Sequence, residues 1–243
     1  MVKRDRADRL LVARGVFESR ARAQAAIAAG QVTADGSLVR KPSDQISSAA
    51  VIAADPAHPY VSRGGVKLAA ALESFSLDVA GRVCLDVGSS TGGFTEVLLA
   101  RGARHVYAVD VGRRQLHARL LNCEQVTSIE QTDIRNLGPS LLPEPPDLAT
   151  IDVSFISLKR VLPHVSGLLK PSATLLALIK PQFEAGRRHV KKGIVRDAGI
   201  QAAVGEEIER TVAALGWNVL GRMESPILGR DGNREFLIGA QHD

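Results

Sequence analysis

The chain has 243 residues, of which 45% are hydrophobic and 23% are charged, proportions that exclude a disordered or fibrous protein. Its length suits a small module joined to a domain of ordinary size. No run approaches the roughly 20 apolar residues of a membrane span. The first residues, 1–9, are charged and do not lead into an apolar signal core, so we expect a cytoplasmic protein.

Charge and cysteine content narrow the function classes further. Cys84 and Cys123 lie far apart and lack other Cys or His at ligand spacing, so we expect neither a metal site nor a disulfide framework. The net charge is +5, and residues 1–60 hold nine Lys or Arg against six Asp or Glu, which places +3 of the excess there. This asymmetry favours contact with a polyanion.

The first 50 residues predict two short helices and a hairpin. Apolar residues among charges indicate a helix over 6–14, which Gly15 ends, and Ser19 can cap a second helix over 20–29 before Gly30. Asp35-Gly36 lies between two short strand-like pieces and is a strong hairpin signal. We expect residues 41–43 to end this unit and residues 50–60, with their proline-containing composition, to form a linker.

Arginines on these helices can lie along an RNA backbone, although an ordinary solvated surface would have the same composition. The order of the segments 6–15, 19–23 and 29–43 resembles the S4 RNA-binding domain, a small α+β fold. The resemblance implies RNA contact. The candidate RNA-binding residues are Arg4, Arg6, Arg14, Arg20, Arg22, Lys41 and Arg63.

From residue 83 onward, short apolar runs alternate with helical periods, as is typical of an α/β doubly wound, mostly parallel sheet. Strands are expected at 83–87, 105–111, 126–130, 148–153 and 174–179, and helices at 65–72, 94–100, 115–121, 158–169 and 202–215. Two more strand candidates, 217–223 and 235–239, follow a single helix, which predicts an antiparallel final pair. The domains are therefore expected at 1–60 and 61–243, with the linker at about 55–62.

A glycine-rich loop follows the first of these strands. Glycines there let backbone approach a ligand at the carboxyl edge of the sheet. The spacing matches neither a phosphate-binding P-loop nor the dinucleotide fingerprint. The candidate cofactor residues of this loop are Asp86, Gly88, Ser89, Ser90, Thr91, Gly92, Gly93 and Phe94.

Acidic residues at successive strand ends indicate the cofactor. Asp86 suits a cationic amino-acid group, Asp110 suits a ribose diol, and Asp133 lies where an adenine amino group is expected. S-adenosylmethionine carries these groups. Each of these acids alone could be an ordinary polar strand end or a helix cap. Three acids at three successive strand ends favour the cofactor.

Four further charged residues are candidates for catalysis. Asp152, Lys180 and Glu235 lie at ends of the later strands, and Lys67 lies on the helix before the first strand. A ribose hydroxyl needs a base to attack a sulfonium methyl group at neutral pH. We assign that role to Lys180, with Asp152 and Glu235 orienting it and Lys67 steering the hydroxyl or phosphate. Each could instead be an isolated surface charge.

Other methylation chemistries have different sequence marks. Methylation of a base amino group commonly uses an Asn/Asp-Pro-Pro-aromatic segment, whereas residues 152–155 are Asp-Val-Ser-Phe. Methylation at pyrimidine carbon 5 needs a nucleophilic cysteine near the later strands, where none occurs. With these two chemistries disfavoured, methylation of an oxygen remains.

The tetrad Lys67, Asp152, Lys180 and Glu235 resembles that of FtsJ-like ribose methyltransferases, which have a Rossmann-like fold. With the segments 62–68, 86–95, 152–157 and 180–184, the whole chain resembles the TlyA/haemolysin-A family. Ser90 departs from the glycine of the broader methyltransferase loop.

The family resemblance implies 2′-O-methylation of cytidine in ribosomal RNA, on free RNA or a ribosomal subunit. The chain ends soon after its last expected strand, like the shorter members, so we expect large-subunit RNA. We also expect a monomer. Two alternatives are a non-catalytic ribosome-assembly factor and a membrane-lytic protein. The second should carry an export signal and an amphipathic membrane segment, which the sequence does not show.

Overall fold

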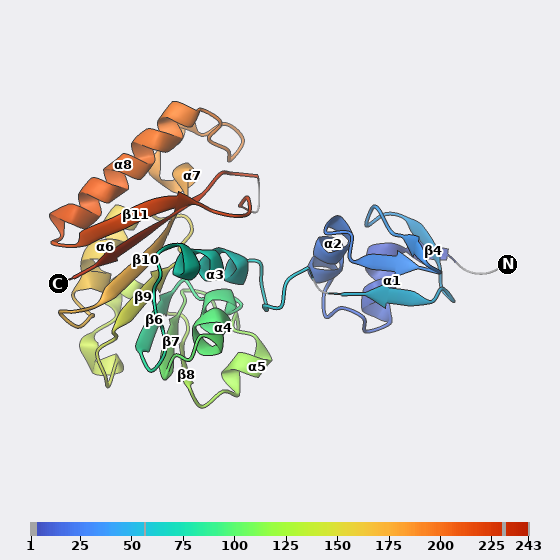
Figure 1. Cartoon of the computed structure of the whole chain (residues 1–243), viewed down its shortest axis with the longest axis horizontal. Coiled ribbons are helices and arrows are strands. Elements are labelled where there is room, and N and C mark those ends of the chain that lie inside the picture. The colour runs from blue at the N-terminus through green and yellow to red at the C-terminus, as the bar shows by residue number, and fades with distance from the viewer. Residues whose placement is uncertain (1–3, 56, 230–231, 243) are drawn as a thin grey trace. The chain divides into compact units, whose positions relative to one another are not determined.

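The computed structural model describes residues 4–55, 57–229 and 232–242. Contacts divide the chain into two compact units, Met1–Pro59 and Tyr60–Asp243 (Figure 1). We describe each unit by itself.

The N-terminal unit packs two helices against short antiparallel strands. Its elements are β1 (Arg4–Arg6), α1 (Ala7–Ala13), α2 (Arg20–Ala28), β2 (Val32–Ala34), β3 (Ser37–Leu38), β4 (Gln45–Ser47) and β5 (Ile52–Ala54). The Ser19 hydroxyl caps α2 by accepting the Arg22 N–H at 3.3 Å. Asp35 and Gly36, with φ of 50° and 74°, form the predicted hairpin turn between β2 and β3.

Two boundaries predicted for this unit are wrong. Residues 41–43 do not end it, because β4 pairs with β1 and β5 pairs with β2, both antiparallel. Residues 52–54 are therefore a strand and not part of a linker. These strands are only three residues long, too short to show an alternating pattern, and backbone pairing with distant residues stabilises them.

The larger unit is a sheet covered by helices on both faces. Its elements are α3 (Gly64–Ser74), β6 (Val83–Val87), α4 (Gly93–Ala100), β7 (His105–Val109), α5 (Ala118–Leu121), β8 (Val126–Ile129), η1 (Ile134–Asn136), η2 (Pro139–Leu141), β9 (Leu148–Ile151), α6 (Leu158–Ser166), β10 (Thr174–Ile179), α7 (Pro181–Glu184), η3 (Arg187–His189), α8 (Ala198–Ala214), β11 (Asn218–Glu224) and β12 (Phe236–Gln241).

The seven strands have the order β11-β12-β10-β9-β6-β7-β8. The strands from β10 to β8 are parallel, and β12 inserts antiparallel between β10 and β11. The predicted α/β class, mostly parallel sheet and antiparallel final pair are confirmed. From β6 the next two strands are added on one side, and β9 and β10 are then added on the other side. Ligands bind at such a switch point in open α/β sheets.

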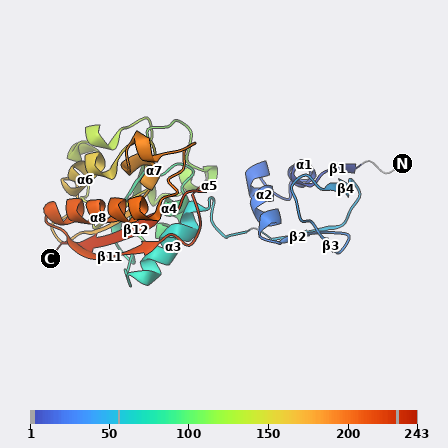
Figure 2. The same ribbon diagram turned by 90° about the horizontal axis from the view of Figure 1, so that it is seen from above.

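Alternate residues of the strands face opposite cores. Leu85, Ile151 and Ile179 pack with α6 and α8 on one face. Cys84, Leu148 and Leu178 pack with α3 and α4 on the other. Figures 1 and 2 show the two helical layers from two directions. The buried strands fix which residues reach the carboxyl edge of the sheet, and so position the site.

Three strands end earlier than predicted, and β8 does so by one residue, at Ile129. β7 ends at Val109 and β9 at Ile151, so Asp110 and Asp152 are the first residues after these strands. Among the helices in the described part of the chain, none is both long and apolar enough to cross a membrane.

Candidate active site

The loop after β6 begins with a close approach of two strands. Gly88 has φ of 80°, and a Cβ there would lie 2.5 Å from the backbone oxygen of Asp152. The N–H groups of Gly88 and Ser89 both donate to the Val109 carbonyl, at 2.8 and 3.1 Å. A side chain at residue 88 would therefore push β9 away from β6, so glycine is needed for steric and conformational reasons.

Two adjoining cavities open at this edge of the sheet. One, of about 520 Å³, is lined by the loop after β6, by α3, by α7 and by the start of β12. The other, of about 560 Å³, is lined by the loops after β7, β8 and β9. They share wall residues Gly88, Ser90, Asp152, Ser154 and Phe155. Each is large enough to enclose a good part of a small ligand.

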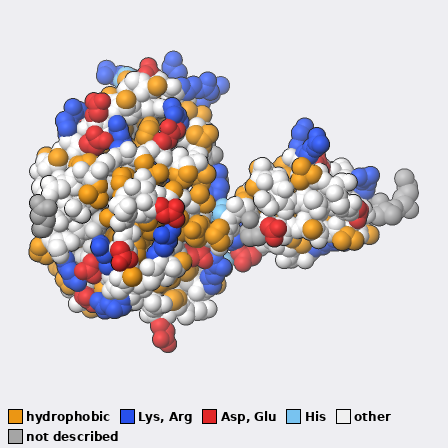
Figure 3. Space-filling view, in the orientation of Figure 1, with side chains coloured by type: hydrophobic (Ala, Val, Ile, Leu, Met, Phe, Trp, Pro, Cys, Tyr) orange, Lys and Arg blue, Asp and Glu red, His pale blue; other side chains and the backbone are white. Residues whose placement is uncertain are grey.

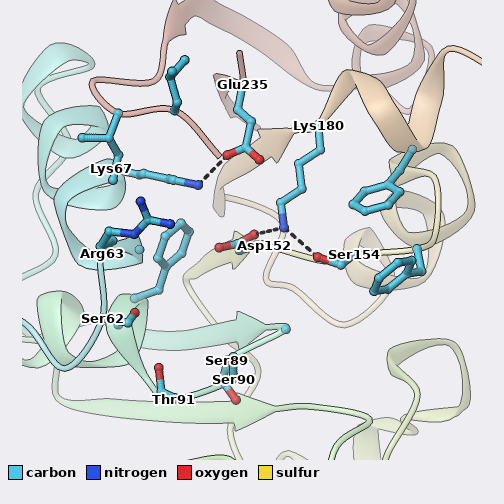
Figure 4. Close-up of a pocket in the computed structure, with 18 of the residues that line it drawn as sticks. Ser62, Arg63, Lys67, Ser89, Ser90, Thr91, Asp152, Ser154, Lys180 and Glu235 are labelled. Atoms are coloured by element: carbon cyan, nitrogen blue, oxygen red, sulfur yellow. Dashed lines mark hydrogen bonds and ion pairs between the residues drawn. The ribbon is translucent and has the colours of Figure 1, made fainter. Parts of the chain in front are cut away.

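The structure brings the four predicted tetrad residues together in the first cavity (Figure 4). The Lys180 amine lies 2.5 Å from an Asp152 carboxylate oxygen and donates to Ser154 Oγ at 2.9 Å. Across the cavity, Lys67 Nζ donates to Glu235 Oε2 at 2.5 Å. Two lysine–carboxylate pairs thus face one space.

Burial explains why these charges are paired. Lys67 is 8% exposed and Glu235 is 3% exposed. Removing one member of such a pair would leave a charge in a poorly solvated site, which is costly. Lys67 is held by α3, and Glu235 by the start of β12, so the pair also fixes the helix against the strand.

The second cavity has an apolar wall with acidic residues at its edge. Val109, Val111, Ile134 and Ile156 contribute apolar surface. Asp110 accepts the N–H groups of Ser90 and Gly112 at 2.8 and 2.7 Å, which leaves further lone pairs for a ligand. Asp133 accepts both the N–H and the guanidinium of Arg135, and this hydrogen bonding lowers the pKa of its carboxyl to about 2.

Asp86 lies in a different place from the one we expected. It does not line either cavity but is fully buried beneath the loop. Its two carboxylate oxygens accept the hydroxyls of Thr95 and Thr150, at 2.6 and 3.0 Å. Burial raises the pKa of this carboxyl to about 7, although the threonine hydroxyls oppose the shift. A direct contact with a cationic ligand group is not supported by this position.

The other candidate cofactor residues of this loop either line the first cavity or, like Asp86, have a structural role. Gly88, Ser89, Ser90, Thr91, Gly93 and Phe94 line the first cavity. Gly92 does not: it has φ of 94°, and a Cβ there would collide with Leu120 and Leu116. Its glycine is explained by the turn into α4 and by packing.

Several cavity residues were missed by sequence reasoning. Ser154 bonds Lys180, and Phe155, Gln182 and Phe183 line the first cavity. Phe155 is 91% exposed, has φ of 64°, and its ring centroid lies 5.1 Å from that of Phe183. Within the segment 152–155 only Asp152 was predicted as a site residue, because exposure of a phenylalanine cannot be inferred from its sequence neighbours.

The predicted RNA-binding residues differ in how many contacts they make within the protein. Arg6 and Arg20 both bind Asp8, which is fully buried, and the Arg6 guanidinium holds the pKa of that carboxyl well below its usual range. Arg14 donates to the Ala50 and Ser48 carbonyls, both at 2.6 Å.

The remaining four carry fewer structural contacts. Arg4 donates to the Gln45 carbonyl at 2.8 Å, and Arg22 lies 3.6 Å from Glu18. Lys41 is exposed, and Arg63 is exposed at the rim of the first cavity. Part of the predicted basic surface therefore also stabilises its own unit.

The fold and the site define a Rossmann-like S-adenosylmethionine-dependent methyltransferase domain preceded by an S4 domain. The family model of the FtsJ-like methyltransferases matches residues 60–242, and that of the S4 domain matches residues 5–52. The chain belongs to the FtsJ-like methyltransferase family and to the group of TlyA relatives, and it also carries an S4 domain.

Individual relatives cover most of the chain. The 16S/23S rRNA (cytidine-2′-O)-methyltransferase TlyA of Mycobacterium tuberculosis is 44% identical over 98% of this chain and 90% of its own. The 23S rRNA (cytidine-2′-O)-methyltransferase TlyA of Campylobacter jejuni is 38% identical over 73% of this chain and 69% of its own. A solved structure from Streptococcus thermophilus, named as a hemolysin, is 40% identical, covers 100% of this chain and 90% of its own, and has a TM-score of 0.79.

Proposed function

We propose that this protein transfers a methyl group from S-adenosylmethionine to the 2′-hydroxyl of a cytidine in ribosomal RNA. The observation that carries the proposal is the Lys180 amine, held between Asp152 and Ser154 and facing a cavity that also contains the Lys67–Glu235 pair. The two TlyA relatives, whose names state this reaction, support the substrate class.

The second cavity fits the cofactor. Its apolar wall suits an adenine ring, and Asp110 can accept a ribose diol while keeping its two backbone N–H groups. Asp133 can hold the adenine amino group only with the oxygen lone pairs that Arg135 does not use. Ser90 at the shared wall, with Ser89 and Thr91 in the first cavity, would hold the amino-acid end, and Asp86 supports the loop from below through Thr95.

When bound, S-adenosylmethionine supplies an electrophilic methyl group. The protein must place the ribose oxygen and remove its proton. Lys180, as the neutral amine, accepts the proton from the hydroxyl while it donates to Ser154, and the Asp152 carboxylate beside it stabilises the ammonium that forms. The Lys67–Glu235 pair presents a fixed positive charge to the hydroxyl oxygen or the neighbouring phosphate.

The cavity mouth suits an RNA nucleotide. The exposed ring of Phe155, adjacent to Phe183, offers a flat surface on which an unstacked base can lie. Arg63 at the rim can bind a phosphate. The S4 unit would bind RNA outside the target nucleotide. Large-subunit RNA is favoured because both named TlyA relatives act on 23S rRNA.

The Lys180→Ala variant tests the proposal. We expect it to lose methyl transfer from labelled S-adenosylmethionine to unmethylated ribosomal RNA by at least about a thousandfold, since the base is removed. Cofactor binding, measured by calorimetry, should be nearly unchanged. Lys159→Ala is the matched control, because Lys159 lies on the same unit in an ion pair with Glu207.

Two outcomes would contradict the assignment. Full transfer by Lys180→Ala would remove Lys180 from the chemistry. Absence of transfer by the unmodified protein, together with retained ribosomal RNA binding, would favour the role of a non-catalytic assembly factor.

A further inference from the structure

The segment between α7 and α8 carries a dense run of positive charge. Residues 187–196 contain five Lys or Arg and no Asp or Glu: Arg187, Arg188, Lys191, Lys192 and Arg196. All five are exposed, and in the described part of the chain none of them is paired with a carboxylate. Figure 3 shows Lys and Arg side chains gathered at the top of the larger unit, the end at which Figure 1 draws the segment before α8.

The centre of this segment is a tight hairpin. Lys191 and Ile194 exchange two backbone hydrogen bonds, at 3.0 and 3.1 Å. Lys192 and Gly193 between them have φ of 52° and 79°, the left-handed conformations of a type I′ turn. The turn therefore holds two lysines at a defined place.

The hairpin is anchored to the segment that carries Glu235. Asn233 is 1% exposed; its amide donates to the Gly193 carbonyl at 2.8 Å and accepts the Val195 N–H at 3.1 Å. Gln201 on α8 also donates to the Val195 carbonyl, at 2.7 Å.

The other end of the segment follows α7, the short helix that begins directly after Lys180. In this helix, Phe183 lines the first cavity and donates its N–H to the Lys180 carbonyl at 2.9 Å. The cationic segment thus follows the wall that carries Lys180 in the chain and is hydrogen-bonded to the segment that carries Glu235.

We propose that the segment 187–196, which we term the basic hairpin, binds phosphates of the RNA strand next to the target nucleotide. This inference rests on the proposed function for the identity of the RNA. Unpaired, exposed cations on a rigid turn can bind phosphates without first breaking ion pairs within the protein. The segment has no exposed large hydrophobic side chain, so it lacks the apolar surface with which a membrane-binding segment inserts into lipid.

The test removes three charges from the basic hairpin. The variant Arg187→Gln/Lys191→Gln/Lys192→Asn keeps a residue that tolerates positive φ at position 192. The control, Arg101→Gln/Arg104→Gln/Lys170→Gln, removes the same charge from residues paired with Glu73, Glu144 and Asp147. Binding to large-subunit ribosomal RNA transcribed in vitro is measured from low to high salt.

We expect the hairpin variant to bind this RNA on the order of tenfold or more weakly and to lower the salt slope by about 2 to 3. The KM for RNA should rise while the kcat at saturating RNA and the affinity for S-adenosylmethionine stay near those of the unmodified protein. The control should keep the original salt slope.

Three results would overturn the proposal. They are an unchanged RNA affinity and slope in the hairpin variant, an equal loss in both variants, and unchanged RNA binding with lost binding to vesicles of phosphatidylglycerol and phosphatidylcholine. RNA binding is measured without turnover. A protein that transfers no methyl group therefore defeats the proposed function and still leaves this test decisive.

Discussion

The two tetrad lysines differ in the groups that hold them. Lys67 donates to Glu235, which is buried, so this pair suits a fixed charge that positions substrate. Lys180 lies between one carboxylate and the neutral Ser154 hydroxyl, and it faces the wall that both cavities share. We therefore assign the role of base to Lys180, because it lies beside the wall at which a ribose hydroxyl would meet the methyl donor.

Asp86 predicts a pH dependence of stability. Its pKa is raised to about 7 in the folded protein, so the folded state holds this proton more tightly than the unfolded chain does. The stabilisation is complete below the ordinary pKa of an aspartate, near 4, and is lost as pH rises through about 7.

The Asp86→Asn variant removes this titration, because its amide has no proton to lose in this range. The free energy of unfolding of the variant, relative to that of the unmodified protein, should increase between pH 5 and pH 8. Urea unfolding at several pH values measures it, with Asp78→Asn as an exposed control. Parallel pH profiles for the Asp86→Asn and unmodified proteins would contradict the raised pKa.

Among the connecting elements, the loop from β7 to α5 is held by one carboxylate. Glu130, at the end of β8, accepts the N–H groups of Arg114, Gln115 and Leu116, the last two at 2.6 and 3.1 Å. These backbone hydrogen bonds lower the pKa of Glu130. Gln115 and Val111 on this loop line the second cavity, so Glu130 positions part of the cofactor site without lining it.

The Glu130→Ala variant should weaken S-adenosylmethionine binding by roughly tenfold, because the loop loses three hydrogen bonds to a charged group. The kcat at saturating cofactor should change little, since the tetrad is untouched. Calorimetry measures the affinity, and Glu124→Ala is an exposed control on the same unit. An unchanged affinity would show that the loop keeps its conformation without Glu130.

Sequence patterns predicted the long elements well and the short ones poorly. The β6 and β10 strands have the predicted bounds because they are buried on both faces and form continuous apolar runs. The strands β4 and β5 were missed because pairing with distant residues stabilises them. We predicted that Asp86 contacts a ligand, whereas its carboxylate accepts hydrogen bonds from Thr95 and Thr150. A sequence does not show toward which side of a strand end a carboxylate points.

For the whole molecule, the positive charge is divided between two surfaces. The first 60 residues carry an excess charge of +3, which favours contact of the S4 unit with a polyanion. Part of that charge is used internally, since Arg6 and Arg20 stabilise Asp8. The basic hairpin holds five cations in ten residues of the catalytic unit. In our proposal both surfaces bind RNA, and two binding surfaces on one chain give a higher affinity together than either gives alone.

Nucleoside analysis of ribosomal RNA tests the central claim most directly. Large- and small-subunit RNA from cells with and without this protein is digested and analysed by mass spectrometry, and ribose methylation is mapped along each molecule. We predict a 2′-O-methylcytidine in large-subunit RNA that is absent without the protein and is restored by the unmodified chain but not by Lys180→Ala. Identical ribose methylation in both RNA samples, or a methyl group lost from a base instead of a ribose, would contradict the account.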